Sequence, residues 1–362
     1  MSQYIAQITS RSLLDKVVLI TGGANGIGAS LVRQCLENGA NVCFGDLDNM
    51  SGERLFRTCR DEFPPEEEQP PRVLFQPTDV TDYASVLALF DLAFTTYKRI
   101  DHVVSAAGIV EIGNWFDFGL TLQTVRQVPT HKVLDVNLLG SMYVTRIASV
   151  YLRHNRGPGV DRSVLLFSCS SGFKESPSLF VYQASKHGVV GLMRSLRGYI
   201  SSPYKHYLRI NTVCPWMTQT DGIKKIEQQW KEASLPTNTP REVSTVAASI
   251  LSDPSLNGKS MFVEGGRAWE IEGNIDRLEA QWLGEAPSKT LAAGQAFLDD
   301  GAIWTARPRK RSSISSGVPP GVPLSKIKGI HHSPKSQAHD LTQGLANGLT
   351  NGHANGLTNE VH

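Results

Sequence analysis

The chain of 362 residues has few cysteines and no paired cysteine motif. The five cysteines are an odd number, and none of them forms a C-x-x-C pair, which argues against a disulfide framework or a zinc site. The ten histidines show no ligand spacing either, so we expect no metal site. Reduced thiols are typical of an intracellular protein, and we expect a cytoplasmic one. The cysteines are Cys35, Cys43, Cys59, Cys169 and Cys214.

Long apolar runs and a basic fold are missing as well. No run of about 18 apolar residues occurs, so we expect no membrane span. Residues 1–16 lack the apolar stretch of a signal peptide. The net charge is +2, but residues 307–362 hold seven basic and two acidic residues, which leaves the rest of the chain at −3. We therefore expect no nucleic-acid partner, since that would need a basic face on the fold itself.

Short apolar runs alternate with longer amphipathic stretches along most of the chain. This alternation predicts an α/β fold: a Rossmann-like, doubly wound parallel sheet in a single domain with a disordered C-terminal tail. The expected strands are 17–20, 41–45, 73–76, 102–105, 163–168, 208–213 and, as the last strand, 260–263. The expected helices are 26–38, 82–97, two within 121–154, 179–201 and 241–251.

The composition divides the chain into three parts. Residues 1–266 are expected to form the dinucleotide-binding domain, and 267–305 a helical extension with short helices over 268–283 and 289–299. Residues 306–362 are rich in Ser, Pro and Gly and then in Asn, Gly, Leu and Thr, a composition that cannot bury enough surface to offset chain entropy. We interpret this tail as a disordered, solvated extension, the alternative being contact with a membrane surface or an acidic partner.

A glycine-rich turn covers Thr21–Gly28, with the sequence TGGANGIG. It follows an expected strand and opens an expected helix, which is the context of a dinucleotide pyrophosphate site. Gly22 would permit the tight turn, and Gly26 and Gly28 would let the backbone approach the ligand. The alternative is an ordinary glycine-rich turn.

Asp46 ends the second expected strand and points to the choice of cofactor. A carboxylate there can accept both ribose hydroxyls and would repel a 2′-phosphate. Asn25, the residue before Gly26, is not a cation. Both features favour NAD over NADP. Asp79, farther along, would bond the adenine amino group or merely cap the helix that begins near Asp82.

Tyr182 and Lys186 stand four residues apart on an expected helix and so share a face. A lysine cation can lower the pKa of a neighbouring phenol, which could then exchange a proton near neutral pH. A phosphate cradle and a tuned phenol in one chain suggest hydride transfer at a carbonyl or an alcohol.

These motifs together resemble the classical short-chain dehydrogenase/reductase family, over residues 14–266. Within the family the chain looks most like 15-hydroxyprostaglandin dehydrogenases and related fungal enzymes of secondary metabolism. The motifs are Thr21-Gly22-(x)₃-Gly26-Ile27-Gly28, Asp79-Val80, Ala106-Ala107-Gly108, Asn137 and Tyr182-(x)₃-Lys186.

The resemblance implies a role for each matching residue. Tyr182 would be the general acid/base, and Lys186 would hold the nicotinamide ribose and lower the Tyr182 pKa. Asn137 would support a water that relays protons to Lys186, and Thr218 would contact the nicotinamide amide. Ile27, Val80, Ala106 and Gly108 would complete the cofactor site. We also expect a small-molecule substrate and a homodimer or homotetramer.

The chain departs from the family pattern at functional positions. The catalytic serine, 13 residues before the tyrosine, is replaced by Cys169, flanked by Ser168 and Ser170. A thiol is a poor donor, so either Cys169 polarises the substrate weakly or a neighbouring hydroxyl, such as that of Ser168, turns in. Trp216 replaces a glycine and could shape the substrate pocket. Residues 219–238 occupy the position of a substrate lid, and Trp115, Phe116 and Phe118 would line the pocket or pack in the core.

The sequence thus predicts an NAD(H)-dependent oxidoreductase acting on a secondary alcohol or ketone of an apolar substrate, in a secondary-metabolite pathway. One alternative is an NADP-dependent ketoreductase. The other, suggested by Cys169 and Trp216, is a cofactor-binding scaffold with degraded catalysis.

Overall fold

A computed structural model describes residues 3–9, 11–154, 157, 159–201 and 207–299. The predicted disorder of residues 306–362 lies outside the described residues, as does the end of the predicted extension.

The described residues form one nine-stranded sheet, in the order β1-β9-β8-β7-β6-β5-β2-β3-β4. Strands β2 to β8 pair in parallel, while β9 pairs antiparallel with both β8 and β1. The chain order reverses between β2 and β5, which is where doubly wound sheets bind ligands. This confirms the predicted fold class. The strands are β1 Gln3–Tyr4, β2 Val17–Thr21, β3 Asn41–Asp46, β4 Val73–Pro77, β5 His102–Ser105, β6 Ser163–Phe167, β7 Arg209–Pro215, β8 Ser260–Glu264 and β9 Arg267–Glu270.

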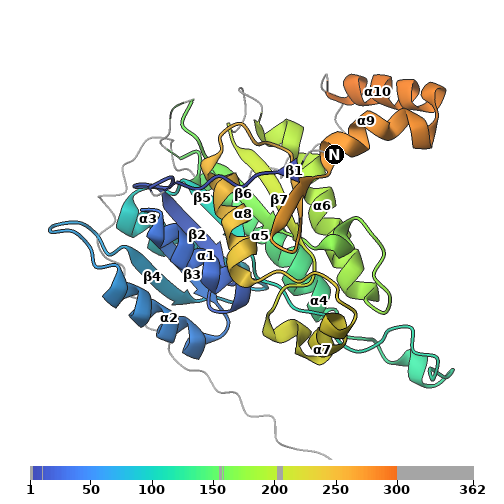
Figure 1. Cartoon of the computed structure of the whole chain (residues 1–362), viewed down its shortest axis with the longest axis horizontal. Coiled ribbons are helices and arrows are strands. Elements are labelled where there is room, and N and C mark those ends of the chain that lie inside the picture. Colours follow the sequence, from blue (N-terminus) through green and yellow to red (C-terminus); the bar gives the residue numbers. More distant parts are fainter. Residues whose placement is uncertain (1–2, 10, 155–156, 158, 202–206, 300–362) are drawn as a thin grey trace, which may run out of the picture. The chain divides into compact units, whose positions relative to one another are not determined.

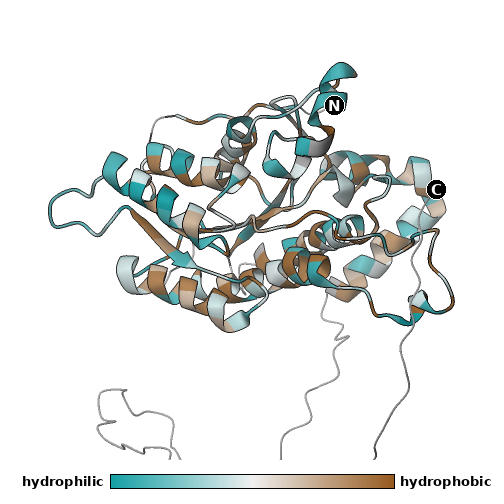
Figure 2. Ribbon diagram, turned by 90° about the horizontal axis from the view of Figure 1, so that it is seen from below, coloured by the Kyte–Doolittle hydropathy of each residue, from teal (hydrophilic) through white to brown (hydrophobic). Residues whose placement is uncertain are grey.

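Helices cover both faces of the sheet (Figure 1). Helices α1, α2 and α8 pack on one face, and α3, α5 and α6 pack on the other. Figure 2 shows hydrophobic and hydrophilic stretches on the same helices, as expected of helices that cover a sheet on one side. The principal helices are α1 Gly26–Glu37, α2 Asn49–Glu62, α3 Tyr83–Tyr97, α4 Lys132–Leu134, α5 Gly140–Tyr151, α6 Phe180–Ser201, α7 Lys224–Glu232, α8 Pro240–Ser252, α9 Glu272–Leu283 and α10 Glu285–Asp299.

The central strands β2, β3, β5 and β6 place apolar residues in the cores on both faces of the sheet, and this explains their hydrophobic runs. In β2, Val18 and Ile20 join the core under α1 and α8, while Val17 and Leu19 join the core under α3 and α5. Every residue of β2 is buried. Such two-sided burial is typical of parallel sheets.

Four local features differ from the expectation. Helix α2 was missed because it is strongly polar, with Gly52 and Cys59 as its buried residues. The sheet does not end with β8: the chain turns back through Gly265 and Gly266, both at positive φ, into β9. The helix expected from residue 268 therefore begins at Glu272. Within 121–154 there is a 3₁₀ turn, Thr124–Arg126, and then helical residues from Lys132 to Tyr151.

Helix α9 is fixed to the sheet domain by a buried carboxylate. Glu272 is 2% exposed and accepts hydrogen bonds from Arg194 at 2.8 and 3.1 Å, from Arg197 at 3.4 Å and from Ser260 at 2.7 Å. These bonds satisfy the buried charge.

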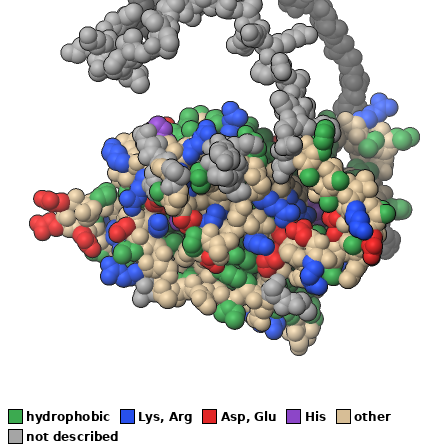
Figure 3. Space-filling view, turned by 90° about the horizontal axis from the view of Figure 1, so that it is seen from above, with side chains coloured by type: hydrophobic (Ala, Val, Ile, Leu, Met, Phe, Trp, Pro, Cys, Tyr) green, Lys and Arg blue, Asp and Glu red, His purple; other side chains and the backbone are tan. Residues whose placement is uncertain are grey.

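Charges of both signs are interspersed on the face shown in Figure 3, so this face carries no field of a single sign. Of the helices in the described part of the chain, none combines the length and the apolar character needed to cross a bilayer.

Candidate active site

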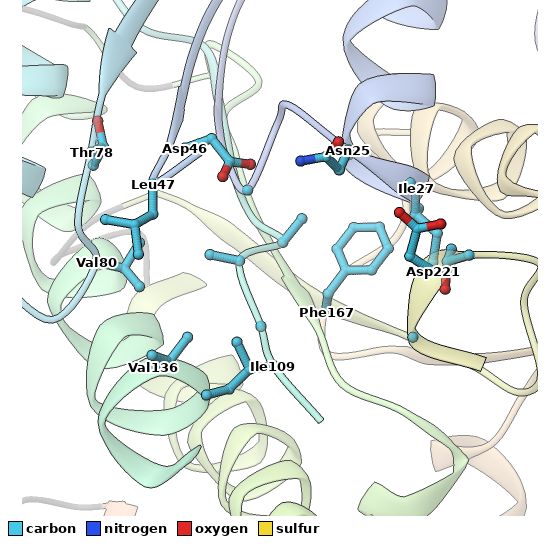
Figure 4. A pocket seen from close by; sticks show the side chains of 18 of the residues that line it. Asn25, Ile27, Asp46, Leu47, Thr78, Val80, Ile109, Val136, Phe167 and Asp221 are labelled. Carbon is cyan, nitrogen blue, oxygen red and sulfur yellow. The ribbon is translucent and has the colours of Figure 1, made fainter. Parts of the chain in front are cut away.

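A cavity of about 580 Å³ opens at the carboxyl ends of β2, β3 and β5 (Figure 4). It lies at the reversal point of the sheet, where the sequence placed a dinucleotide. Among the predicted cofactor residues, the cavity wall includes Gly22, Asn25, Gly26, Ile27, Gly28, Asp46, Asp79, Val80, Ala106 and Gly108.

The glycine turn leaves no room for side chains. A Cβ on Gly22, which has φ of 73°, would lie 2.5 Å from the backbone of Ala107. A Cβ on Gly28 would lie 1.9 Å from the Gly22 carbonyl oxygen. The turn therefore brings bare backbone and the N-terminus of α1 to the cavity, which fits the pyrophosphate of a dinucleotide.

Asp46 is held at the cavity edge by backbone donors. Its Oδ2 accepts a hydrogen bond from Ala24 N at 2.9 Å, and its Oδ1 accepts one from Asp48 N at 3.0 Å. An ionised carboxylate offers about four acceptor positions, so two remain for ligand hydroxyls. Figure 4 shows Asp46 and Asn25 on the same side of the cavity.

Asp79 has a local structural contact. Its Oδ1 accepts from Thr81 N at 2.9 Å and from Thr81 Oγ1 at 2.7 Å. The cap of α3 is Asp82, which accepts from Ala84 N at 2.9 Å. Asp79 is thus not the helix cap that one interpretation of the sequence expected, and it does line the cavity. Val80 is buried against Gly140.

Tyr182 and Lys186 share a face of α6, as their spacing predicted. Lys186 Nζ lies 5.5 Å from the centroid of the Tyr182 ring and donates to the Phe167 carbonyl at 3.1 Å. The lowering of the Tyr182 pKa by the Lys186 cation stays a prediction, and burial acts against it. Burial, followed by the neighbouring Cys169 thiol, raises the pKa of Tyr182 well above its usual value. Burial also lowers the pKa of Lys186, so its cation is itself disfavoured.

Asn137 lies in a π-helical turn, Asp135–Leu139, between α4 and α5. The side chain is 1% exposed and holds the segment after β5. Its Oδ1 accepts from Ile109 N at 2.8 Å, and its Nδ2 donates to Ile109 O at 3.0 Å and to Ser185 Oγ at 3.1 Å. Single π turns are frequent at functional sites because they displace one residue from the helical register.

The serine and cysteine candidates after β6 face different surroundings. Ser168 is 5% exposed, and its hydroxyl donates to the Lys186 carbonyl at 2.9 Å. Cys169 is half-buried, has an extended backbone and lies near enough to the Tyr182 phenol to raise its pKa. Ser170 Oγ lies 3.6 Å from the Cys169 sulfur. The structure thus brings Cys169, rather than Ser168, to the phenol.

The segment after β7 contributes to the cavity, but not through the predicted residue. Thr218 is 5% exposed, and its hydroxyl donates to Trp216 O at 3.0 Å. From this segment, residues 219–222, including Thr220 and Asp221, form part of the cavity wall. Thr220 lies in this wall although the sequence analysis did not single it out.

The aromatic residues expected near the substrate lie in two places. Trp216 packs edge-on against Trp230 of α7 at 5.3 Å, so this part of the predicted lid is attached to the end of β7. Phe116 is 67% exposed and Phe118 is fully exposed, so neither lines the cavity or packs in the core.

All five cysteines are free thiols. In the described part of the chain no three His, Cys, Asp or Glu side chains are grouped so that they could hold a metal ion.

Comparison with known proteins identifies the class of protein. The family model "short chain dehydrogenase" matches residues 16–231. The chain is 30% identical over 264 residues to the "Short-chain dehydrogenase/reductase ascJ" of Acremonium egyptiacum, which covers 73% of this chain and 83% of that protein. It is 28% identical to the "5'-hydroxyaverantin dehydrogenase" of Dothistroma septosporum, over 75% of this chain and 91% of the relative.

A solved structure supports the fold. The 3-ketoacyl-(acyl-carrier-protein) reductase of Brucella melitensis superimposes with a TM-score of 0.59 at 22% identity, over 70% of this chain and 98% of the reductase. The chain belongs to the short-chain dehydrogenase family. It is an oxidoreductase that transfers a hydride with a nicotinamide cofactor.

Proposed function

We propose that the protein is an NAD(H)-dependent oxidoreductase that acts on a secondary alcohol or ketone of an apolar substrate in secondary metabolism. The observation that carries the cofactor choice is Asp46, held at the cavity edge by Ala24 N and Asp48 N. A fixed carboxylate suits the two ribose hydroxyls of NAD and repels a 2′-phosphate. Among the described residues that line the cavity, Lys132 is the one cation, and it lies on α4 rather than beside Asp46.

The substrate class rests on the relatives and on an aromatic pair near the end of β7. The Dothistroma protein is named for a hydroxylated compound, and an Eggerthella lenta relative, 30% identical over 268 residues, is named a 3beta-hydroxysteroid dehydrogenase. Both names describe an alcohol on a larger carbon skeleton. The half-buried Trp216 and Trp230 lie beyond the end of β7 and supply apolar surface for such a skeleton.

Each residue of the candidate site has its own proposed role in the reaction. When bound, a nicotinamide supplies or accepts the hydride at the substrate carbon. Tyr182 donates a proton to the substrate oxygen in reduction and accepts it in oxidation. Burial favours the protonated phenol, which is the form that donates in reduction, whereas oxidation needs the phenolate. Lys186 would hold the cofactor ribose, and Asn137 would support a proton relay to it. Cys169 would lie beside the substrate oxygen as a weak donor.

A turnover screen tests the proposal. Purified protein is assayed over a set of hydroxy and keto compounds, aliphatic and polycyclic, with NADH/NAD and NADPH/NADP, by nicotinamide absorbance. We expect turnover of an apolar ketone or secondary alcohol, faster with NADH. Faster turnover with NADPH would support the ketoreductase alternative. Cofactor binding without turnover of any compound would support the scaffold alternative and overturn the enzyme assignment.

We further propose a cytoplasmic homodimer or homotetramer, an expectation supported by the free thiols and by the family resemblance. The division into a domain of residues 1–266, an extension over 267–305 and a tail over 306–362 also remains a proposal.

A further inference from the structure

Glu111 bonds directly to the backbone of the tyrosine helix. It lies in the segment that follows β5, some 70 residues before α6, and is half-buried. Its Oε2 accepts a hydrogen bond from the backbone N of Tyr182 at 2.6 Å, and its Oε1 accepts one from Val181 N at 3.2 Å.

These two amides are among the first of α6, where backbone N–H groups have no partner within the helix. A carboxylate at this place acts as a cap supplied from elsewhere in the chain. It satisfies two donors and complements the positive end of the helix dipole. Charge-assisted hydrogen bonds of this kind are short and strong. One of the two donors belongs to Tyr182 itself, so the contact fixes the backbone that carries the phenol.

The carbonyl side of Tyr182 is held through the same segment. Ser185 Oγ donates to Tyr182 O at 2.6 Å and accepts from Asn137 Nδ2 at 3.1 Å. The Asn137 amide in turn binds both backbone groups of Ile109. Residues 109–111 are therefore tied to Tyr182 at its amide by Glu111 and at its carbonyl through Asn137 and Ser185.

We propose that Glu111 is a positioning residue that sets the place of Tyr182 relative to the substrate. The inference rests on the proposed role of Tyr182 as the acid/base. Glu111 acts through the backbone of Tyr182 and does not itself exchange a proton with the substrate. Because misplacement of a catalytic group by about 1 Å can cost on the order of 100-fold in rate, removing this cap affects kcat more than binding.

The test compares Glu111→Ala with Glu111→Gln in the full-length protein. We expect Glu111→Ala to lower kcat by about tenfold or more while the Kd for NADH, from nicotinamide fluorescence, changes less than about twofold. Glu111→Gln keeps one carbonyl oxygen for Tyr182 N but loses the charge and the second acceptor, so it restores part of the lost kcat. The order wild type, Gln, Ala in kcat supports the proposal. Equal kcat in all three proteins overturns it.

Two control variants separate positioning from stability. Asp82→Ala removes a comparable cap from α3, because the Asp82 side chain accepts a hydrogen bond from Ala84 N at 2.9 Å. It should lower the melting temperature about as much as Glu111→Ala and leave kcat within about twofold. Asp117→Ala removes a carboxylate of the same segment that bonds Gly119 N, with no effect expected on kcat. If Asp82→Ala lowers kcat as much as Glu111→Ala, the effect is general destabilisation and the proposal fails.

A fourth variant distinguishes this proposal from the assignment of Tyr182. If Tyr182→Phe is inactive and Glu111→Ala is fully active, only the positioning role is overturned. If Tyr182→Phe remains active, the acid/base assignment is overturned as well.

Discussion

The hydroxyl of Ser168 donates a 2.9 Å hydrogen bond to the backbone carbonyl of Lys186. This bond ties the residue that follows β6 to the first half of α6. A Cβ on Gly172 would lie 2.3 Å from the same hydroxyl, so Ser168 has little freedom to turn toward a substrate. The residue beside the phenol is then Cys169, at the position where the family has its serine.

The roles of Ser168 and Cys169 can be separated by substitution. Cys169→Ser should preserve or raise kcat, because a hydroxyl is a better donor than a thiol, and Cys169→Ala should cost little. Ser168→Ala should lower the free energy of unfolding by about 1 kcal/mol through loss of the bond to Lys186. Steady-state kinetics and urea denaturation measure the two effects. A loss of about 100-fold in kcat for Ser168→Ala, or for a Ser170→Ala variant, would assign the polarising hydroxyl to that serine instead.

Tyr182→Phe should abolish turnover and leave NADH binding nearly unchanged. The ring remains to pack at its buried position, but the proton donor is lost. Removal of a general acid/base typically costs about 10²–10⁴-fold in rate. Kinetics and NADH fluorescence provide the two readouts, and turnover within about tenfold of the wild type would refute the assignment.

Local patterns were enough to predict the parallel core of the fold. Strands β2, β3, β5 and β6 place apolar residues on both faces, and their apolar runs are visible in the sequence, so their position depends little on distant residues. Helix α2 was not predicted because few of its residues are buried against the sheet. Strand β9 was not predicted because its four residues form a strand by pairing with β8 and β1. That pairing depends on tertiary contacts, which local propensity does not contain.

Sequence motifs were enough to place part of the candidate site. The glycine turn, Asp46 and the Tyr182/Lys186 pair occupy the places that the sequence indicated. The hydroxyl of Ser168 and the carboxylate of Glu111 could not be placed, because their partners lie 18 and about 70 residues away. The direction of the Tyr182 pKa also depends on burial, which follows from the packed structure rather than from a spacing of four residues.

Cofactor preference should depend on Asp46. We expect NADH to bind at least about tenfold more tightly than NADPH, since a 2′-phosphate would meet the carboxylate. Asp46→Asn keeps an acceptor oxygen but removes the charge, so the two affinities should converge. Asp221→Asn, a change of another carboxylate in the cavity wall, should affect both cofactors equally. Equal affinity of the wild-type protein for the two cofactors would contradict the role of Asp46.

Gly28→Ala should damage the cofactor cradle. The added methyl group would lie 1.9 Å from Gly22 O, so the turn must move. Overpacking of this size costs about 1–3 kcal/mol, which corresponds to about 5- to 150-fold in NADH affinity if the turn shifts in the folded protein. Gly191→Ala is the control: Gly191 is exposed on α6 with open space around its Cβ position, and the change should stabilise the helix by about 0.5–1 kcal/mol. Unchanged NADH affinity in Gly28→Ala would show that the cradle is not the cofactor site.

His102 predicts a specific loss of stability in acid. It begins β5, at the opposite end of the strand from the cavity. Its Nδ1 bonds Ser163 Oγ at 2.9 Å, and its Nε2 has no hydrogen-bond partner. Burial lowers the pKa of His102 from 6.5 to about 4. Below pH 6.5 the unfolded chain takes up a proton that the folded protein does not, so stability falls as the pH drops from 6.5 to about 4. The loss amounts to about 3 kcal/mol at most.

Urea denaturation at several pH values should show a shallower decline in stability with falling pH for His102→Gln than for the wild type. His187→Gln, a change of an exposed histidine on α6, should retain the wild-type slope. Parallel declines in His102→Gln and the wild type would mean that another group causes the acid sensitivity.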